Sequence, residues 1–169
     1  SYFGALDSCI QTVMASFNSW NGSKLHGNEY LLTEVLKNQM NFDGFVVGDW
    51  NGHGQVPGCS NASCAQSLNA GVDMFMVPEN WKDLYRNTLR QVKSGDISLE
   101  RLDDAVKRIL LVKERLGMFD GKQPNNTPFT KVGTQKNRDI ARQAVRESLV
   151  LLKNNNKLLP LSRDMKLLV

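Results

Sequence analysis

Three short apolar segments, each followed by a helical pattern, constrain the fold of this chain more than any other feature. They span residues 12–17, 44–48 and 73–77, and Gly, Asn, Asp or Pro bounds each one, as is common for buried strands. The segment ends at Phe17, Gly48 and Val77 lie 31 and 29 residues apart, a spacing that fits a strand, a helix and their loops. The repeat predicts an α/β chain with a parallel sheet.

An apolar stripe at helical spacing follows each of these segments. The chain then continues into a longer helix, which Ser98 can cap because its hydroxyl can accept a hydrogen bond from the first turn. Gly117 is expected to end that helix. The expected helices cover residues 28–40, 61–69, 81–93 and 98–115.

Residues 120–133 are rich in Gly, Pro and Asn and lack periodicity, so they are expected to form an interdomain linker. Thr134 then caps a further helix, and residues 166–169 resemble the opening of another strand. Three strand-helix units are a fraction of an eightfold barrel, which takes about 250 residues. We therefore expect the chain to begin and end inside a larger protein.

Charge and apolar run length exclude two classes of partner. The net charge of +4 is concentrated in residues 131–169, which hold nine Lys/Arg against three Asp/Glu but no Phe, Tyr or Trp. Nucleic-acid binding is not expected, because single-stranded bases need aromatic groups on which to stack. No membrane span is expected either, since the longest apolar runs fall far short of the roughly 20 residues that cross a bilayer.

The cysteines leave several alternatives open. Cys59 and Cys64 could form a local disulfide, could bind zinc together with His26 or His53, or could be plain loop residues; zinc ranks below the other two, and no metal site is predicted. His26 is expected to be a structural hydrogen-bonding residue within its own loop. Cys9 is expected to be a buried small side chain on a helix.

Residues 52–57 imitate part of the dinucleotide-binding fingerprint, because they follow a strand and precede a helix. The match fails at the third glycine, where Pro57 stands. A nucleotide would also leave Asp49 and Trp50 without a role. No cofactor is therefore expected.

Asp49 is the first candidate for chemistry. It follows the apolar segment 44–48, and barrel enzymes place their catalytic groups at the carboxyl ends of such strands. Aspartate after a strand is also a common turn residue, so the position alone does not choose between a catalytic and a structural role.

The residues around Asp49 resemble glycoside hydrolase family 3 over nearly the whole chain. The similarity includes Phe42-Asp43-Gly44-Phe45-Val46-Val47-Gly48-Asp49-Trp50, where the family usually has Ser in place of Gly48. Because the motifs occur in order and at compatible spacings, the combination is far more specific than any one of them. The motifs that carry the resemblance span residues 13–22, 24–37, 42–50, 70–78, 144–154 and 158–161.

The resemblance implies a β-glucosidase or exo-β-glucanase that removes a terminal glucosyl unit from a β-glucoside or β-glucan with retention of configuration. Asp49 would be the nucleophile of a covalent glycosyl-enzyme. Trp50 matches the aromatic wall beside the leaving sugar, and Phe17 lies where the family often has Tyr beside the nonreducing sugar. The resemblance also implies that residues 1–119 are the C-terminal βα units of a (β/α)8 barrel and that residues 134–169 begin the family's second domain, an α/β sandwich. The family supplies its general acid/base mainly from that second domain, so no residue of this chain is assigned that role.

Two other classes of function remain open on the sequence alone. One is a non-catalytic carbohydrate-binding protein on the same scaffold, and the other is an interaction module built from the basic C-terminal helices. Family resemblance also implies a periplasmic or secreted protein. Because the acid/base is not assigned to this chain, the isolated 169 residues are expected to be inactive or nearly so.

Overall fold

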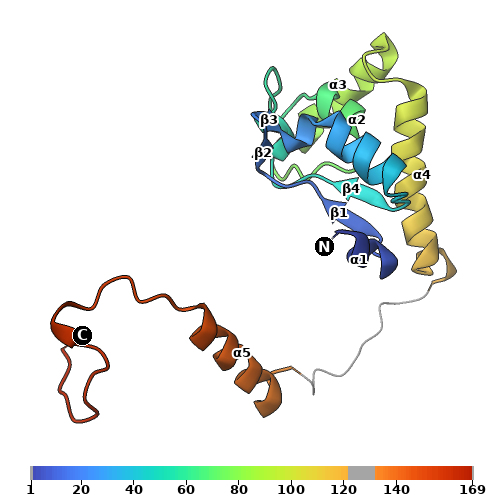
Figure 1. The fold of residues 1–169 in the computed structure, drawn as a ribbon. Helices are drawn as coiled ribbons and strands as arrows, with labels where there is room; N and C mark the ends of the chain where they lie inside the picture. The colour runs from blue at the N-terminus through green and yellow to red at the C-terminus, as the bar shows by residue number, and fades with distance from the viewer. Residues whose placement is uncertain (1, 122–131, 169) are drawn as a thin grey trace. The chain divides into compact units, whose positions relative to one another are not determined.

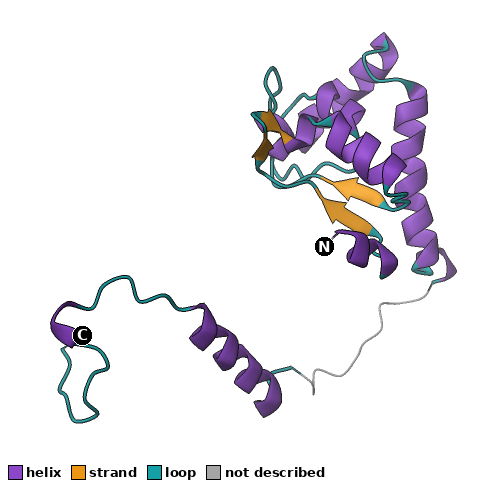
Figure 2. Ribbon diagram, viewed as in Figure 1, coloured by secondary structure: helices purple, strands orange, loops and turns teal. Residues whose placement is uncertain are grey.

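The structure of the chain, a computed structural model, describes residues 2–121 and 132–168. It divides into two compact units, Ser1–Gln123 and Pro124–Val169. Most of the linker predicted over residues 120–133 lies outside the described residues. The helices and strands of each unit are drawn in Figures 1 and 2.

A parallel pair of strands is the centre of the first unit. Strand β1 (Thr12–Met14) pairs with β4 (Phe45–Val47), with Val13 opposite Val46, and the two strands run side by side in Figure 1. The predicted α/β chain with parallel pairing is confirmed. Both strands are shorter than the predicted segments.

The prediction of a third strand over residues 73–77 is wrong. The segment is reduced to one parallel bridge between Val47 and Met74. The reason lies at Asp73, whose Oδ2 accepts the main-chain N–H of Val46 at 2.7 Å, while its own N–H donates to the Val46 carbonyl. The Asp73 carboxylate therefore accepts the N–H of Val46, which would donate to a main-chain carbonyl if residues 73–77 formed a strand beside β4. The segment still follows β4, since the N–H of Gly48 donates to the Met74 carbonyl at 2.8 Å.

Helices surround this pair of strands. The predicted N-cap is confirmed, because Ser98 Oγ accepts the N–H of Arg101 at 3.1 Å, and Gly117 adopts the left-handed conformation expected where a helix ends. A helix was expected around Cys9, but the first helix of the structure ends at Asp7. The helices of the first unit are α1 (Tyr2–Asp7), a π-helix (Tyr30–Gln39), α2 (Ala65–Ala70), α3 (Trp81–Ser94) and α4 (Leu99–Arg115), with short 3₁₀ segments at Leu25–Gly27, Gly52–Gln55 and Met118–Asp120.

The apolar core lies where β1, β4 and the π-helix meet. Leu32 and Leu36 of the π-helix pack on the strands, and Val46 of β4 is fully buried. The buried cluster consists of Ala15, Leu32, Leu36, Phe42, Val46 and Val72. This core fixes the end of β4, where Asp49 follows.

A small hairpin between β1 and the π-helix was not predicted. Strands β2 (Ser19–Trp20) and β3 (Ser23–Lys24) are antiparallel, and Asn21-Gly22 between them has positive φ at both residues. Such a pair is the preferred two-residue hairpin turn, because both positions need positive φ. The hairpin leads the chain directly into the 3₁₀ segment that carries His26.

The second unit contains helix α5 (Gln135–Ser148) and a short 3₁₀ segment at Asn155–Lys157. The predicted cap at Thr134 is confirmed, because its Oγ1 accepts the N–H of Asn137 at 3.4 Å. No described residue of this unit is buried. The expected strand opening over residues 166–169 is not formed at 166–168, where the described part of the chain offers it no paired strand.

Candidate active site

Asp49 lies at the carboxyl end of β4, two residues after the strand ends at Val47. Main-chain hydrogen bonds hold the turn on both sides of it: Gly48 donates to Met74, and Asn51 donates to the Met76 carbonyl at 2.9 Å. Asp49 is half-buried. Its position at a strand end is the one predicted from the sequence.

The Asp49 side chain is oriented by its own turn. Its Oδ1 accepts the N–H of Trp50 at 2.6 Å, and its main-chain carbonyl accepts the N–H of Gly52 at 2.9 Å. The first of these bonds fixes one carboxylate oxygen against the backbone. The carboxylate is therefore held by the main chain rather than by another charged side chain.

An imidazole lies directly behind the turn. His26 is only 1% exposed, and its Nε2 lies 2.9 Å from the main-chain nitrogen of Asp49. Because an amide N–H can only donate, Nε2 accepts this bond and the ring proton of the neutral imidazole is on Nδ1. Burial lowers the pKa of His26 below its ordinary value of 6.5, while the Asp49 carboxylate acts in the opposite direction. His26 is therefore a hydrogen-bonding residue, as expected from the sequence, but its partner Asp49 lies outside its own loop.

Gly52 makes room for this imidazole. A Cβ built on Gly52 would overlap the Cε1 and Nε2 atoms of His26. Any side chain at position 52 would therefore displace the ring from Asp49. The glycine is required by close approach, which is a different role from the phosphate-binding one that the fingerprint match suggested.

The structure brings two of the three predicted site residues to the same imidazole. Phe17 meets His26 edge to face, with 6.3 Å between ring centroids and a 73° interplanar angle, while Asp49 bonds its Nε2. Trp50 follows Asp49 and has 57% of its surface exposed; Phe17 is 41% exposed. Lys24 Nζ lies over the Phe17 ring, 5.7 Å from its centroid, so one face of Phe17 has a cation beside it, whereas more than half of the Trp50 surface is exposed. The contact of Phe17 and Trp50 with a sugar stays a prediction.

The loop after Asp49 is closed by a disulfide between Cys59 and Cys64, which decides among the alternatives left open by the sequence. The described residues contain no group of three or more His, Cys, Asp or Glu placed to bind a metal ion. His53 is 1% exposed and its Nε2 lies 2.8 Å from the Asn61 carbonyl. Cys9 is exposed and lies beyond the end of α1, so its predicted burial on a helix is wrong.

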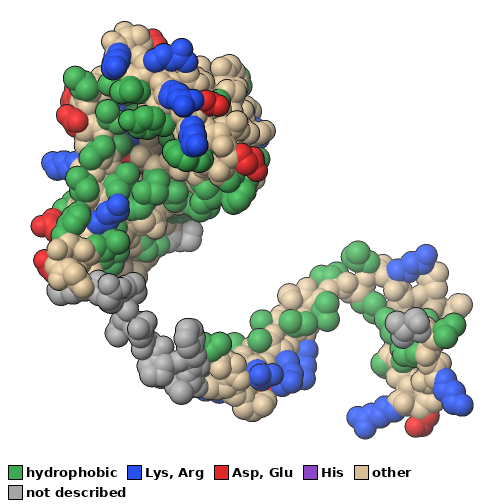
Figure 3. Space-filling model, turned by 180° about the vertical axis from the view of Figure 1, so that it is seen from behind, with side chains coloured by type: hydrophobic (Ala, Val, Ile, Leu, Met, Phe, Trp, Pro, Cys, Tyr) green, Lys and Arg blue, Asp and Glu red, His purple; other side chains and the backbone are tan. Residues whose placement is uncertain are grey.

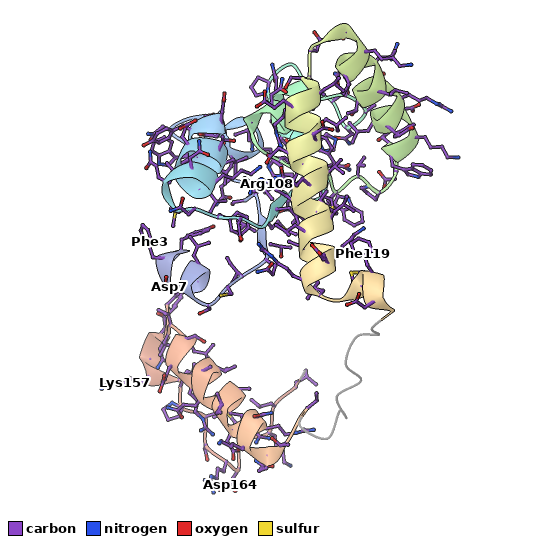
Figure 4. All side chains as sticks on the ribbon, turned by 90° about the vertical axis from the view of Figure 1, so that its right-hand side faces the viewer. Phe3, Asp7, Arg108, Phe119, Lys157 and Asp164 are labelled. Carbon is purple, nitrogen blue, oxygen red and sulfur yellow. A yellow bond between two sulfur atoms is a disulfide. The ribbon has the colours of Figure 1, made fainter. Side chains whose placement is uncertain are left out.

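A buried ion-pair network behind β4 was not predicted. Asp73 Oδ1 accepts from Lys37 Nζ at 2.7 Å and from Arg101 Nη2 at 2.5 Å, and the Asp73 carboxylate is fully buried. Burial lowers the pKa of Lys37 to about 8, against the opposing effect of Asp73. Arg108, labelled on α4 in Figure 4, donates to the carbonyls of Phe42 and Gly44 at the start of β4. These side chains fix the strand that leads to Asp49.

The chain is similar to several known proteins. The model of the glycosyl hydrolase family 3 N-terminal domain matches residues 1–112. The exo-1,3/1,4-β-glucanase of a Pseudoalteromonas species is 52% identical, with a TM-score of 0.75 over 95% of this chain. The β-glucosidase of Listeria innocua, solved in complex with glucose, is 32% identical, with a TM-score of 0.69 over 95% of the chain. A periplasmic β-glucosidase of Salmonella typhimurium is 32% identical over 96% of the chain.

The matched proteins are much longer than this chain. It covers 21% of the Pseudoalteromonas chain, 23% of the Listeria chain and 22% of the Salmonella protein. Among the described residues, no helix combines the length and the apolar character that crossing a membrane requires.

Proposed function

The chain belongs to glycosyl hydrolase family 3, and from that premise we propose that the protein carrying it hydrolyses terminal β-D-glucosidic bonds with retention of configuration. The observation that carries the proposal is the position of Asp49: a half-buried carboxylate at the end of a parallel strand, anchored through its main chain on both sides. Barrel glycosidases need a carboxylate at this edge of the sheet.

The proposed reaction has two steps. Asp49 attacks the anomeric carbon, an ester bond forms between that carbon and the carboxylate, and the glycosidic bond breaks as a second carboxylic acid protonates the leaving oxygen. The same second group then removes a proton from water, which attacks the anomeric carbon and releases glucose and the Asp49 carboxylate. We assign the second group to the part of the protein outside this chain.

Two aromatic residues complete the sugar site in this proposal. Trp50 offers an exposed indole next to the nucleophile, on which the apolar face of a pyranose ring of the leaving group would pack. Phe17, which packs against His26, would border the nonreducing sugar, the one that Asp49 attacks. The substrate class is a β-glucoside or β-glucan oligosaccharide.

Uncovered apolar surface supports the proposed domain assignment, in which residues 1–119 form the C-terminal part of a (β/α)8 barrel. An apolar hollow of about 400 Å³ opens beside β1 and the π-helix, and Figure 3 shows apolar side chains gathered over one face of the same unit. Further barrel strands would cover such surface. Residues 120–133 are the proposed linker and residues 134–169 the proposed start of an α/β sandwich. The hollow is lined by residues that include Tyr2, Phe3, Val13, Met14, Leu31 and Val35.

We propose a periplasmic or secreted location for the whole protein. The Cys59–Cys64 disulfide supports it, because disulfides persist in oxidising compartments. The similarity to the periplasmic β-glucosidase of Salmonella typhimurium supports it as well.

Activity is tested in a carrier enzyme, which we define as the Pseudoalteromonas exo-β-glucanase with its matching segment replaced by residues 1–169. Asp49→Asn should lower kcat on an aryl β-glucoside by at least about a thousandfold, because the amide is a poor nucleophile. Asp83→Asn, the same chemical change at an exposed site on α3, is the matched control and should leave kcat unchanged. Near-normal turnover by the Asp49 variant would rule out the assignment.

Covalent trapping separates a glycosidase from a non-catalytic sugar-binding protein. A 2-fluoroglucoside with a good leaving group should label the carrier enzyme, and peptide mass mapping should place the label on Asp49. Sugar binding without any covalent label would instead favour the binding protein. The isolated 169-residue chain should hydrolyse neither substrate at a rate comparable with the carrier enzyme.

A further inference from the structure

We propose that His26 is a positioning residue for the nucleophile: its Nε2 accepts the main-chain N–H of Asp49 and thereby sets the backbone of the turn from which the carboxylate projects. The inference rests on the proposed role of Asp49. It adds a residue 23 positions earlier in the chain to the machinery of the site.

The geometry limits this role to a neutral imidazole. The His26 ring is enclosed on two sides. The Phe17 ring meets it edge to face with 6.3 Å between centroids, and the main chain of Gly52 lies so close that a Cβ at position 52 would overlap the ring. Nε2 must remain unprotonated to accept the amide N–H. The charged or titratable groups that act on the ring are Asp49 on the nucleophile turn, His53 on the next 3₁₀ segment and Lys24 on β3.

Loss of the acceptor would act directly on the nucleophile. The Asp49 amide would be left without its partner at a partly buried position, so the turn would shift to find another acceptor. Asp49 Oδ1 is fixed to the amide of the very next residue, Trp50, so a change in this turn changes the direction of the carboxylate. Small displacements of a reacting group lower the rate of the chemical step more than substrate binding.

The test compares two variants of the carrier enzyme whose side chains at position 26 have similar length. His26→Gln retains a carbonyl oxygen at about the place of Nε2, whereas His26→Met fills the space without a strong acceptor. The Met variant should lose between about tenfold and a hundredfold in kcat with KM changed less than about threefold, because the ground-state contacts to the sugar remain. The Gln variant should stay within about fivefold of the parent kcat. If Met destabilises the fold too far for assay, His26→Leu replaces it.

His53→Met is the matched control for burial. Its imidazole is 1% exposed, like that of His26, but it bonds the Asn61 carbonyl rather than Asp49. Its variant should lower the thermal unfolding temperature and reduce kcat of the folded enzyme much less than His26→Met does, because His53 bonds Asn61 and not Asp49. Equal kcat losses in the His26→Met and His53→Met variants, or in the His26→Met and His26→Gln variants, would overturn the positioning role.

The 2-fluoroglucoside keeps this proposal separate from the proposed function. If Asp49 is labelled in the parent carrier enzyme and is labelled more slowly in the His26→Met variant, the result supports both the nucleophile role of Asp49 and the positioning role of His26. Label on Asp49 with unchanged labelling and kcat in His26→Met rejects the positioning role alone. Label on a different residue rejects the role of Asp49, and with it the inference about His26.

Discussion

Helices α4 and α5 have similar sequence patterns and different surroundings. Both carry an apolar stripe, and a side-chain hydroxyl caps each at its N-terminus. Helix α4 buries Ala105 and Val112 and sends two arginines into a hydrogen-bond network, whereas α5 buries no residue among those described. An amphipathic pattern thus specifies a face for packing, and stability comes from what covers that face.

Proteolysis should give the largest contrast between the two units. Trypsin should cleave after Arg142 and Arg146 on α5 at least about a hundredfold faster than after Arg101 and Arg108 on α4, because exposed helices open locally at little free-energy cost. Mass spectrometry of timed digests measures the rates. In denaturing urea, with a trypsin activity correction, the four sites should be cut at similar rates. Equal rates without urea would show that the first unit is no better protected than the second.

A single carboxylate in each unit sharpens the comparison. Asp73→Asn should lower the free energy of unfolding of the first unit by about 3 kcal/mol, because it removes the buried carboxylate from Lys37 and Arg101 and leaves them only the partly exposed carboxylate of Asp104. Asp139→Asn, which removes an exposed pair with Arg142, should change stability by less than about 0.5 kcal/mol.

Urea titration measures both effects separately. The three tryptophans all lie in residues 1–119, so their fluorescence follows the first unit, and far-UV circular dichroism adds the signal of α5. If Asp73→Asn unfolded at the urea concentration of the parent chain, the buried network would not stabilise the fold as argued.

The smallest expected difference is a dependence on pH. Burial lowers the pKa of both His26 and His53 below 6.5, so between those values and pH 6.5 the unfolded chain binds more protons than the folded one. This contribution to the free energy of unfolding is complete above pH 6.5 and decreases as the pH falls from 6.5 to the folded-state pKa values. Helix α5 contains no histidine and should lack the effect.

Urea midpoints at pH 7 and pH 5, measured by tryptophan fluorescence, test this linkage. The double variant His26→Gln, His53→Gln should show a smaller shift between the two pH values than the parent chain. An equal shift in both proteins would assign the acid sensitivity to carboxylates instead.

Local features of the fold could be predicted because local chemistry determines them. The Ser98 and Thr134 caps are properties of a few consecutive residues, and the apolar segments predict the parallel pair β1 and β4. Asn21-Gly22 carried an equally local signal for the β2–β3 hairpin, and it was missed.

The contacts that build the site could not be predicted in the same way. The strand over residues 73–77 failed because the Asp73 side chain replaces a main-chain partner, which no apolar pattern encodes. Asp49 was predicted from its position after a strand and from family resemblance. Its bond to His26 joins residues 23 positions apart, and spacing alone gives no reason to connect them.

The disulfide after the Asp49 turn has a practical consequence for producing the protein. Cys59 and Cys64 enclose only a few residues, so the crosslink restrains a short stretch and adds little to global folding. Its effect is to restrain the loop between Asp49 and α2. Protein made in a reducing host cytoplasm would lack this crosslink, and export to an oxidising compartment during expression would restore it.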